Sequence, residues 1–369
     1  MKIEEIDKNL KVESAVGLND VVFSSIRRDP FKVYGVYEDE VYGCYRRMPQ
    51  DIANEVSANI SELCCHTAGG RVRFATDSPY IAIRCKMKNI IRFPHITLCG
   101  SAGFDLYETV NGQDKYCGTF FPPISLPEGT YASYRIEMDN GYTSVIHTGG
   151  DEQLRSYTIH FPLYNDVESL EIGLREGARL DVGHAYIPNE LIGYYGSSIT
   201  QGGCASRPGN AYSNIISEHL NMDHINLGFS GSALGETLMA KYIAKLPLSV
   251  FVYDYDHNAP TPEHLEATHE PFFKIIREAR LELPIIMITR PNRYGEEDTL
   301  IRREIIYKTY QNAKEAGDNN VYFVDGGSLF EGMFRDCCTV DGAHPNDAGF
   351  VRMANRIIEI IREIKERES

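Results

Sequence analysis

The sequence predicts an α/β protein in two parts: an antiparallel β-sandwich over residues 1–187, followed by a domain with a parallel sheet over residues 188–369. Two observations carry this prediction. In the first half, apolar and polar residues alternate at period two and turn residues separate the runs, which is typical of an antiparallel sandwich. In the second half, short apolar runs alternate with stretches whose apolar residues stand three and four apart, which is typical of helices covering a parallel sheet.

Strands of the sandwich are expected where the alternation is clearest. Such an alternation predicts one face buried in the core and the other in water. Turn signals such as Asn111-Gly112 separate the runs, and helical periodicity is almost absent from this half. The expected strands are Arg71–Thr76, Tyr80–Cys85, Ser133–Met138, Arg155–Phe161 and Leu170–Leu174.

The second half reads as five strands and five helices in alternation. Such an order requires crossover connections, which are right-handed and place helices on both faces of the sheet. The expected strands are Leu191–Tyr195, Ile225–Leu227, Val250–Tyr253, Pro284–Ile288 and Val321–Val324. The expected helices are Tyr212–Leu220, Leu234–Lys245, Pro262–Arg280, Leu300–Ala316 and Ala348–Lys365.

Composition excludes several classes of partner. The formal net charge is −15, which argues against nucleic acids and anionic membranes, because both polyanions need a basic surface. The first residues, Met1–Lys8, are charged and lack the apolar run of a signal peptide, so we expect a cytoplasmic protein. Nine cysteines in irregular spacing predict reduced thiols and no zinc site. The oligomeric state is left open, a homo-oligomer included.

Gly193–Gly203 combines a buried strand, a tight turn and a helix start. Ligands of open parallel sheets bind outside the carboxyl ends of the strands, so Ser198 stands where a reactive hydroxyl is expected. The alternative is a loop serine beside flexible glycines. The partners downstream decide between the two.

Asp341 and His344 lie on one loop between the last strand and the last helix. An Asp three residues before a His can hold the imidazole in the tautomer that accepts a proton from Ser198. The alternative makes Asp341 a turn residue, Asp347 a helix cap and His344 merely exposed.

Two further segments follow neighbouring strands and offer hydrogen-bond donors. Asn226–Ser232 follows the second strand, where a glycine backbone N–H can approach a ligand closely, and Asn258 follows the third. Taken alone, the first is an ordinary strand-to-helix turn and Asn258 is a loop asparagine. The order Ser, Gly, Asn and Asp-x-x-His along one parallel sheet is improbable by chance.

These four blocks resemble the SGNH (GDSL) hydrolases over residues 190–369. The resemblance implies a flavodoxin-like esterase domain with Ser198 as the nucleophile, His344 as the base and Asp341 orienting the base. It further implies an oxyanion hole made by the N–H groups of Ser198 and Gly231 and by the Asn258 side chain.

The sequence departs from the family pattern at two places without losing a catalytic atom. Ser197 stands where the family usually has the Asp of Gly-Asp-Ser, and Asp256-His257-Asn258 stands where Gly-x-Asn-Asp is usual. Both departures affect the substrate contacts that can be assigned.

The first half carries Gly103-Phe104-Asp105-Leu106-Tyr107, which resembles the Gly-x-Asp-Leu-Tyr signature of a sandwich found ahead of some of these hydrolases. The resemblance implies a jelly-roll-like domain, similar to a carbohydrate-binding module, that contributes to the active-site cleft. The alternative is a strand bent at Gly103. The whole arrangement is similar to two-domain acetyl-mannan esterases, which implies an acetylated oligosaccharide as substrate and an acyl-enzyme intermediate. Acyl transfer to another alcohol and a non-catalytic sugar-binding protein remain as alternatives.

Other polar residues are given structural roles. His257 and His264, with Asp254 and Asp256, lack the spacing of a metal site, so no metal and no cofactor are expected. Cys204 has no activating base visible in the sequence and is interpreted as packing. Arg290 follows a strand at the same sheet edge, where a substrate contact and an internal ion pair are equally reasonable.

Overall fold

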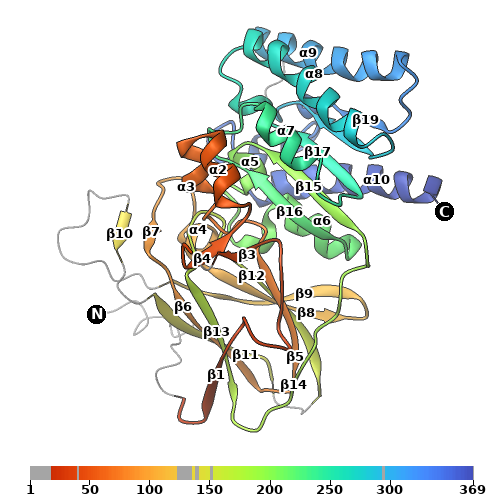
Figure 1. Cartoon of the computed structure of the whole chain (residues 1–369). Helices are drawn as coiled ribbons and strands as arrows, with labels where there is room; N and C mark the ends of the chain where they lie inside the picture. The colour runs from red at the N-terminus through yellow and green to blue at the C-terminus, as the bar shows by residue number, and fades with distance from the viewer. Residues whose placement is uncertain are drawn as a thin grey trace.

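The computed structural model describes residues 18–39, 41–122, 135–137, 141–149, 153–292 and 296–368. The charged segment Met1–Lys8 and the ends of the strand predicted at Ser133–Met138 lie outside these residues. Figure 1 shows the two halves of the chain stacked, with the sandwich strands below and the α/β half above.

Two antiparallel sheets face each other in the first half, as predicted. Their shared core holds Phe74, Ile81, Phe104 and Ile172, all buried. One sheet has the order β1 (Val21–Ser25), β13 (Ser169–Arg175), β6 (Tyr80–Lys86), β11 (Tyr142–His147). The other has the order β14 (Leu180–Asp181), β5 (Arg71–Thr76), β12 (Arg155–His160), β8 (Phe104–Val110), β9 (Gln113–Phe120), with β2 (Lys32–Tyr34) beside β5. Two small pairs join β10 (Arg135–Glu137) to β7 (Asn89–Ile91), and β3 (Tyr37–Asp39) to β4 (Cys44–Arg46).

Three short helices in this half are not anticipated by the sequence pattern: α2 (Gln50–Val56), α3 (Ala58–Leu63) and α4 (Leu98–Ala102). They have one or two turns, which is too short for a periodic apolar stripe. Local caps start two of them, because the Ser57 hydroxyl accepts from the N–H of Ile60 and the Thr97 hydroxyl accepts from the N–H of Gly100.

The second half is a five-stranded sheet in which all pairs are parallel. The strand order places the first strand between the second and the third, which is the flavodoxin-like order with a switch point beside the first strand. The predicted strands are confirmed within two residues. The order is β16 (Asp223–Gly228), β15 (Leu191–Gly196), β17 (Val250–Asp254), β18 (Ile285–Ile288), β19 (Val321–Val324).

Helices cover both faces of this sheet (Figure 1). Tyr194 points into the core under α6 (Tyr212–Leu220) and α10 (Asp347–Glu368), and Tyr195 points into the opposite core. That second core packs under α7 (Thr237–Ile243), α8 (Pro262–Ala279) and α9 (Glu297–Glu315). Helix α7 begins later than predicted, because Gly235 takes a left-handed φ of 76° just before it.

The prediction for β5 is wrong at one point, because the polar face of this strand is not exposed to water. Arg71 and Arg73 are 0% and 2% exposed. The Nε of Arg71 donates to the Tyr186 hydroxyl at 2.7 Å, and its guanidinium also pairs with Asp223 of the α/β half. Arg73 donates to the Asn221 side chain of that half at 3.0 Å. The sheet face predicted to be wet is therefore a polar junction between the two halves.

The Gly-x-Asp-Leu-Tyr segment lies at the same junction. Gly103 ends α4 and does not bend a strand. The buried Asp105 carboxylate accepts from the Arg207 guanidinium at 2.9 Å and from the N–H of Gly209 at 2.8 Å. Tyr107 packs so closely on Gly209 that a Cβ there would meet its ring. The motif binds the segment that follows the Ser198 turn.

Replacing Asp105 by alanine is expected to lower the free energy of unfolding by about 3 kcal/mol or more, because the Arg207 guanidinium and a buried N–H lose their acceptor. Denaturant unfolding measures this loss. The control is Glu171→Ala, which removes the ion pair between the partly exposed side chains of Arg84 and Glu171. This variant should lower the free energy of unfolding by no more than about 1 kcal/mol. Equal losses for the two variants would contradict a docking role for Asp105.

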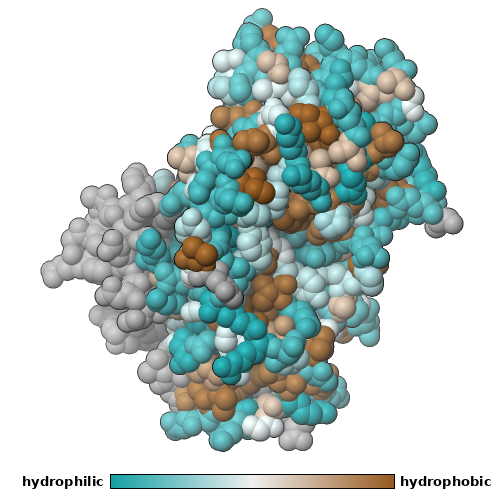
Figure 2. Space-filling model, viewed as in Figure 1, coloured by the Kyte–Doolittle hydropathy of each residue, from teal (hydrophilic) through white to brown (hydrophobic). Residues whose placement is uncertain are grey.

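On the viewed face, Figure 2 shows apolar residues in separate groups among polar ones. Within the part of the chain that the structure describes, no helix has the length and apolar character needed to cross a membrane.

Candidate functional site

Ser198 is the first residue of α5 (Ser198–Gln201), and only Ser197 separates it from the end of β15. The Ser197 hydroxyl caps this short helix by accepting from the N–H of Ile199 at 3.1 Å, and Gly202 ends it with a left-handed φ of 104°. The turn is close-packed, since a Cβ on Gly228 would overlap the backbone of Gln201. The local sequence thus fixes the position of the Ser198 hydroxyl at the carboxyl end of the sheet.

The loop before α10 brings His344 to this hydroxyl. The distance from Ser198 Oγ to His344 Nε2 is 2.9 Å, and the distance from His344 Nδ1 to Asp341 Oδ2 is 2.7 Å. The other oxygen of Asp341 accepts from the N–H groups of Ala343 and His344 at 3.0 and 2.8 Å. Ser198, His344 and Asp341 therefore form one hydrogen-bonded chain.

The electrostatics of this chain favour a charged Asp341. Partial burial opposes the charge, but hydrogen bonds from the backbone and side chain of His344 and from the backbone of Ala343 hold the pKa of Asp341 well below its usual range. The side chains of His344 and Asp341 are 25% and 39% exposed, so water reaches them. Such a carboxylate can hold the imidazole with its proton on Nδ1, and leave Nε2 free to accept the proton of Ser198.

The sequence pattern suggests Asp347 as the helix cap in this loop, but the cap is the preceding residue. Asn346 caps α10, because its side-chain oxygen accepts from the N–H groups of Ala348 and Gly349. The Asp347 carboxylate instead accepts from the N–H of Ser206 at 2.8 Å, which ties α10 to the segment after α5.

The two candidate oxyanion residues follow the strands on either side of β15. Gly231 has a left-handed φ of 65° with open space around its Cα. Asn258 ends the short helix η4 (Asp256–Asn258), and its side-chain nitrogen donates to the carbonyl of Phe229 at 2.8 Å. That bond uses one of the two N–H groups of the amide and orients the other.

The residues interpreted as structural make internal contacts. The Nε2 of His264 lies 2.8 Å from the carbonyl of Leu234, and Asp256 pairs with Arg302 at 3.3 Å. Burial raises the pKa of Asp254 to about 8, against hydrogen bonds from Thr200 and Tyr212 that act in the opposite direction.

Arg290 makes the internal ion pair that was one of its two interpretations. Its guanidinium pairs with Asp298 and donates to the hydroxyl of Thr299 at 2.9 Å, while its backbone N–H donates to Asp256. A substrate contact by Arg290 stays a prediction.

Two residues that sequence reasoning missed, Tyr164 and His95, come from the first half of the chain. The Tyr164 hydroxyl donates to the carbonyl of Ser198 at 3.0 Å. The rings of His95 and His344 lie 5.4 Å apart between centroids. Cys204 is also adjacent, and burial, with the charge of Asp341 adding to it, raises the pKa of its thiol to about 12. No pattern around His95 or Tyr164 in the sequence points to these contacts.

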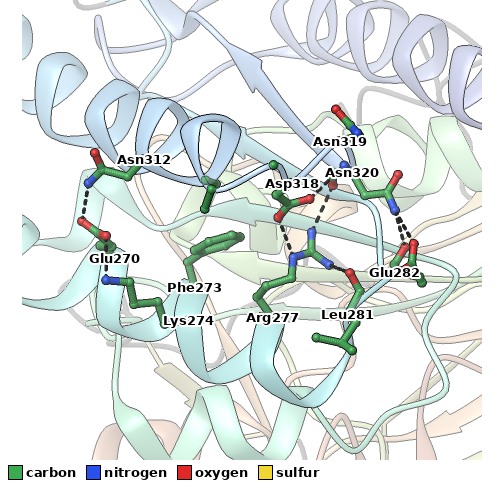
Figure 3. A pocket seen from close by; sticks show the side chains of 13 residues that line it. Glu270, Phe273, Lys274, Arg277, Leu281, Glu282, Asn312, Asp318, Asn319 and Asn320 are labelled. Carbon is green, nitrogen blue, oxygen red and sulfur yellow. Dashed lines mark hydrogen bonds and ion pairs between the residues drawn. The ribbon is translucent and has the colours of Figure 1, made fainter.

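A cavity of about 700 Å³ lies elsewhere, between the carboxyl-terminal parts of α8 and α9 (Figure 3). Its polar side chains pair with one another: the distance from Arg277 Nε to Asp318 Oδ2 is 2.7 Å, and the distance from Asn312 Nδ2 to Glu270 Oε2 is 3.0 Å. None of the sequence-predicted site residues lines it. This cavity is therefore not the candidate site, although it is large enough to hold a small molecule.

Comparisons with known proteins agree with this architecture. Residues 189–362 match the model of the GDSL-like lipase/acylhydrolase family, and residues 21–180 match the GxDLY model, described as the N-terminus of SGNH-hydrolase-type esterases. None of the curated protein sequences compared with this chain matches it significantly.

Solved structures are similar over nearly the whole chain. A protein assigned as a GDSL-like lipase from Bacteroides ovatus is 25% identical, with a TM-score of 0.78 over 94% of this chain and 98% of that chain. A salicylyl-acyltransferase from a tetracycline biosynthetic pathway is 18% identical, with a TM-score of 0.69 over 92% of this chain and 96% of that one. A family two carbohydrate esterase from Clostridium thermocellum, solved with cellohexaose, is 16% identical, with a TM-score of 0.56 over 81% and 93%. The last two similarities show the fold alone.

The α/β half of this chain therefore belongs to the GDSL-like lipase/acylhydrolase family, and the N-terminal domain of SGNH-hydrolase-type esterases precedes it.

Proposed function

We propose that this SGNH-type esterase removes small acyl groups, acetyl foremost, from the hydroxyls of neutral oligosaccharides, with acetylated manno-oligosaccharides as the expected substrates. The observation that carries the proposal is the hydrogen-bonded chain of Ser198, His344 and Asp341 at the carboxyl end of the parallel sheet. The same three residue types in the same order of contacts perform acyl transfer in unrelated folds.

In the first half-reaction, Ser198 Oγ attacks the ester carbonyl carbon while His344 Nε2 takes the hydroxyl proton. The tetrahedral intermediate carries its negative charge on the former carbonyl oxygen. Its collapse breaks the bond to the sugar oxygen, which leaves with the proton that His344 returns. The products are a free sugar hydroxyl and an acyl ester on Ser198.

In the second half-reaction, water attacks the acyl ester, and His344 takes a proton from it. Collapse of the second intermediate releases the carboxylic acid, restores the Ser198 hydroxyl and consumes the proton held by His344. Asp341 holds the imidazole and stabilises its charge in both steps, without itself taking the proton.

The proposed oxyanion hole consists of the N–H groups of Ser198 and Gly231 and the second N–H of the Asn258 amide. Two observations support this assignment. The first N–H of Asn258 is held by the Phe229 carbonyl, so its amide is oriented in advance. The left-handed turn at Gly231 leaves open space where a larger residue would add a Cβ. Donors fixed before the reaction stabilise the developing charge more than mobile ones do.

The substrate class is supported by composition and resemblance. An acidic protein with a net charge of −15 suits a neutral sugar better than a polyanion. The similar fold solved with cellohexaose is that of a carbohydrate esterase. The identity of the sugar as mannose rests on the resemblance of the sequence to acetyl-mannan esterases.

Acyl transfer to a second alcohol is the alternative, because the similar salicylyl-acyltransferase has the same fold. It differs only in the nucleophile that attacks the acyl ester. The side chain of His344 is 25% exposed, and a base open to water favours hydrolysis. A sugar-binding protein without catalysis is disfavoured by the intact hydrogen-bonded chain.

The test is a panel of acetylated saccharides followed by NMR. We expect acetyl signals to vanish from manno-oligosaccharides, with one equivalent of free acetate for each signal lost. Acetyl groups that reappear on an added alcohol, with less free acetate, would instead indicate acyl transfer. The Ser198→Ala variant serves as the matched control for spontaneous hydrolysis and migration of acetyl groups. Stable substrate signals across the whole panel, with aryl acetates also untouched, would contradict the proposed esterase.

A further inference from the structure

We propose that His95, Cys204 and His344 form an inhibitory site for a thiophilic divalent cation, with zinc as the cation that fits best. One ligand atom from each residue lies within 4.8 Å of the ligand atoms of the other two. The effect on rate rests on the proposed function of His344, whereas the site itself rests only on this geometry. The cation would block the reaction and is not a cofactor of it.

The three ligands come from three segments that hydrogen bonds tie together. His95 precedes α4 in the sandwich half, Cys204 follows α5, and His344 precedes α10. The Thr97 hydroxyl donates to the carbonyl of Ser206 at 2.7 Å, and the N–H of Ser206 donates to Asp347 at 2.8 Å. These bonds hold neighbours of all three ligands, so the cluster is built into the junction of the two halves.

Cys204 adopts a backbone conformation with a local cost, while its side chain packs in the apolar core beside Tyr164 and Ile199. It has a φ of 75°, in the left-handed region where a residue with a Cβ is disfavoured by roughly 1–2 kcal/mol relative to glycine. Gly202 and Gly203 precede it, so the chain uses glycine freely in this turn. Its side chain is buried, with 5% of the residue exposed. A strained non-glycine residue beside reactive groups indicates that its side chain has a use.

The orientation of His344 suits a cation as well as it suits a serine. Its Nδ1 faces the Asp341 carboxylate at 2.7 Å, which leaves the lone pair of Nε2 as the ligand. A carboxylate on the far nitrogen is the usual support of a zinc-binding histidine, because it fixes the tautomer and makes the ligand more basic. Among the described residues, neither the His95 ring nor the Cys204 sulfur has a hydrogen-bond partner that would compete with the cation.

The donor set selects the cation. Two imidazole nitrogens and one thiolate suit zinc, with water in the fourth position, whereas magnesium and calcium prefer oxygen ligands. In a tetrahedral zinc site the ligand atoms stand roughly 3.3–3.7 Å apart, so ligand atoms that lie within 4.8 Å of one another need to close by at most about 1.5 Å. Binding releases the thiol proton of Cys204 to solvent and breaks the hydrogen bond from Ser198 to His344 Nε2. The base is then unable to take the serine proton.

The test combines inhibition by ZnCl2 with the absorption of bound cobalt. Hydrolysis of an aryl acetate by the full chain is measured at increasing zinc for wild type, His95→Gln and Cys204→Gly, each against its own metal-free rate. Glycine suits the left-handed turn at position 204, and His95 is only partly buried, so we expect both variants to fold. Together they test the cation site at two independent ligands. We expect the inhibition constant for zinc to rise by more than about 100-fold in both, since loss of a ligand exceeds the 10–100-fold effect of losing a supporting partner. Cys337→Ser removes an exposed thiol and should leave inhibition by zinc unchanged.

Cobalt binding does not depend on activity. CoCl2 added to Ser198→Ala should give a thiolate-to-cobalt charge-transfer band that disappears when Cys204→Gly is added to that variant. The band without inhibition of the wild type would uphold the site and contradict the proposed role of His344. Equal zinc inhibition of wild type and both ligand variants, inhibition by magnesium at the same concentrations, or no charge-transfer band would overturn the proposal.

Discussion

Replacing Ser198 by alanine is expected to lower kcat on an aryl acetate by about 10⁴–10⁶-fold, because the proposed attacking oxygen is removed while the donors of the proposed oxyanion hole remain. The hydroxyl hydrogen-bonds His344, and the helix start beneath it is held by Ser197 and the surrounding backbone. We therefore expect the free energy of unfolding to change little. Steady-state kinetics and denaturant unfolding on the same preparation separate the two effects.

The double variant sharpens this expectation. His344→Ala should lose activity to a similar extent, and Ser198→Ala combined with His344→Ala should be no slower than either alone, because the residues act as one unit. Losses that multiplied in the double variant would mean that the two side chains act in separate steps. Turnover near the wild-type rate by Ser198→Ala would end the proposal of a serine nucleophile.

Most of the α/β half could be predicted because its elements are long and strongly periodic. The strand Val321–Val324 and the helix Tyr212–Leu220 coincide with their predicted ranges. Parallel strands also share one carboxyl edge, so residues that follow different strands could be expected to meet. That rule places Ser198 and His344 together although 146 positions separate them.

The junction between the halves could not be predicted in the same way. The pattern in Arg71–Thr76 correctly indicates a strand, but periodicity says only that the two faces differ, not what covers the polar one. Arg71 is buried because Tyr186 and Asp223 supply its partners. Those pairings join distant parts of the chain and leave no local signal. The same holds for Asp105, whose partner Arg207 lies beyond the domain change.

Residues around the candidate site show the limit of motif reasoning most clearly. Cys204 follows the turn that carries Ser198 and is interpreted from the sequence as packing, because its closeness to His95 and His344 is visible only in the folded structure. His95 stands in no motif, yet its ring lies beside His344. A short motif identifies residues that need each other chemically along one sheet edge. It does not identify a residue that a second domain adds to that edge.

Asp341→Asn is expected to lower kcat by about 10⁴-fold with little change in stability, and the hydrogen bonds of Asp341 give the reason. One oxygen accepts from the N–H groups of Ala343 and His344, so the carbonyl oxygen of asparagine should keep that place. The new NH2 group then faces His344 Nδ1 as a donor. The imidazole must carry its proton on Nε2, where it donates toward Ser198 and cannot take the serine proton.

A matched control lies six positions away. Asp347 is a carboxylate of the same segment that accepts from the N–H of Ser206 and takes no part in the hydrogen-bonded chain to Ser198. We expect Asp347→Asn to keep kcat within about tenfold of the wild type, since a neutral acceptor can still receive that N–H. Nitrogen-15 NMR of the His344 ring reports the tautomer directly, with the proton on Nδ1 in the wild type and on Nε2 in Asp341→Asn. A proton that stayed on Nδ1 in the variant, or an unchanged kcat, would show that Asp341 does not set the tautomer of the base.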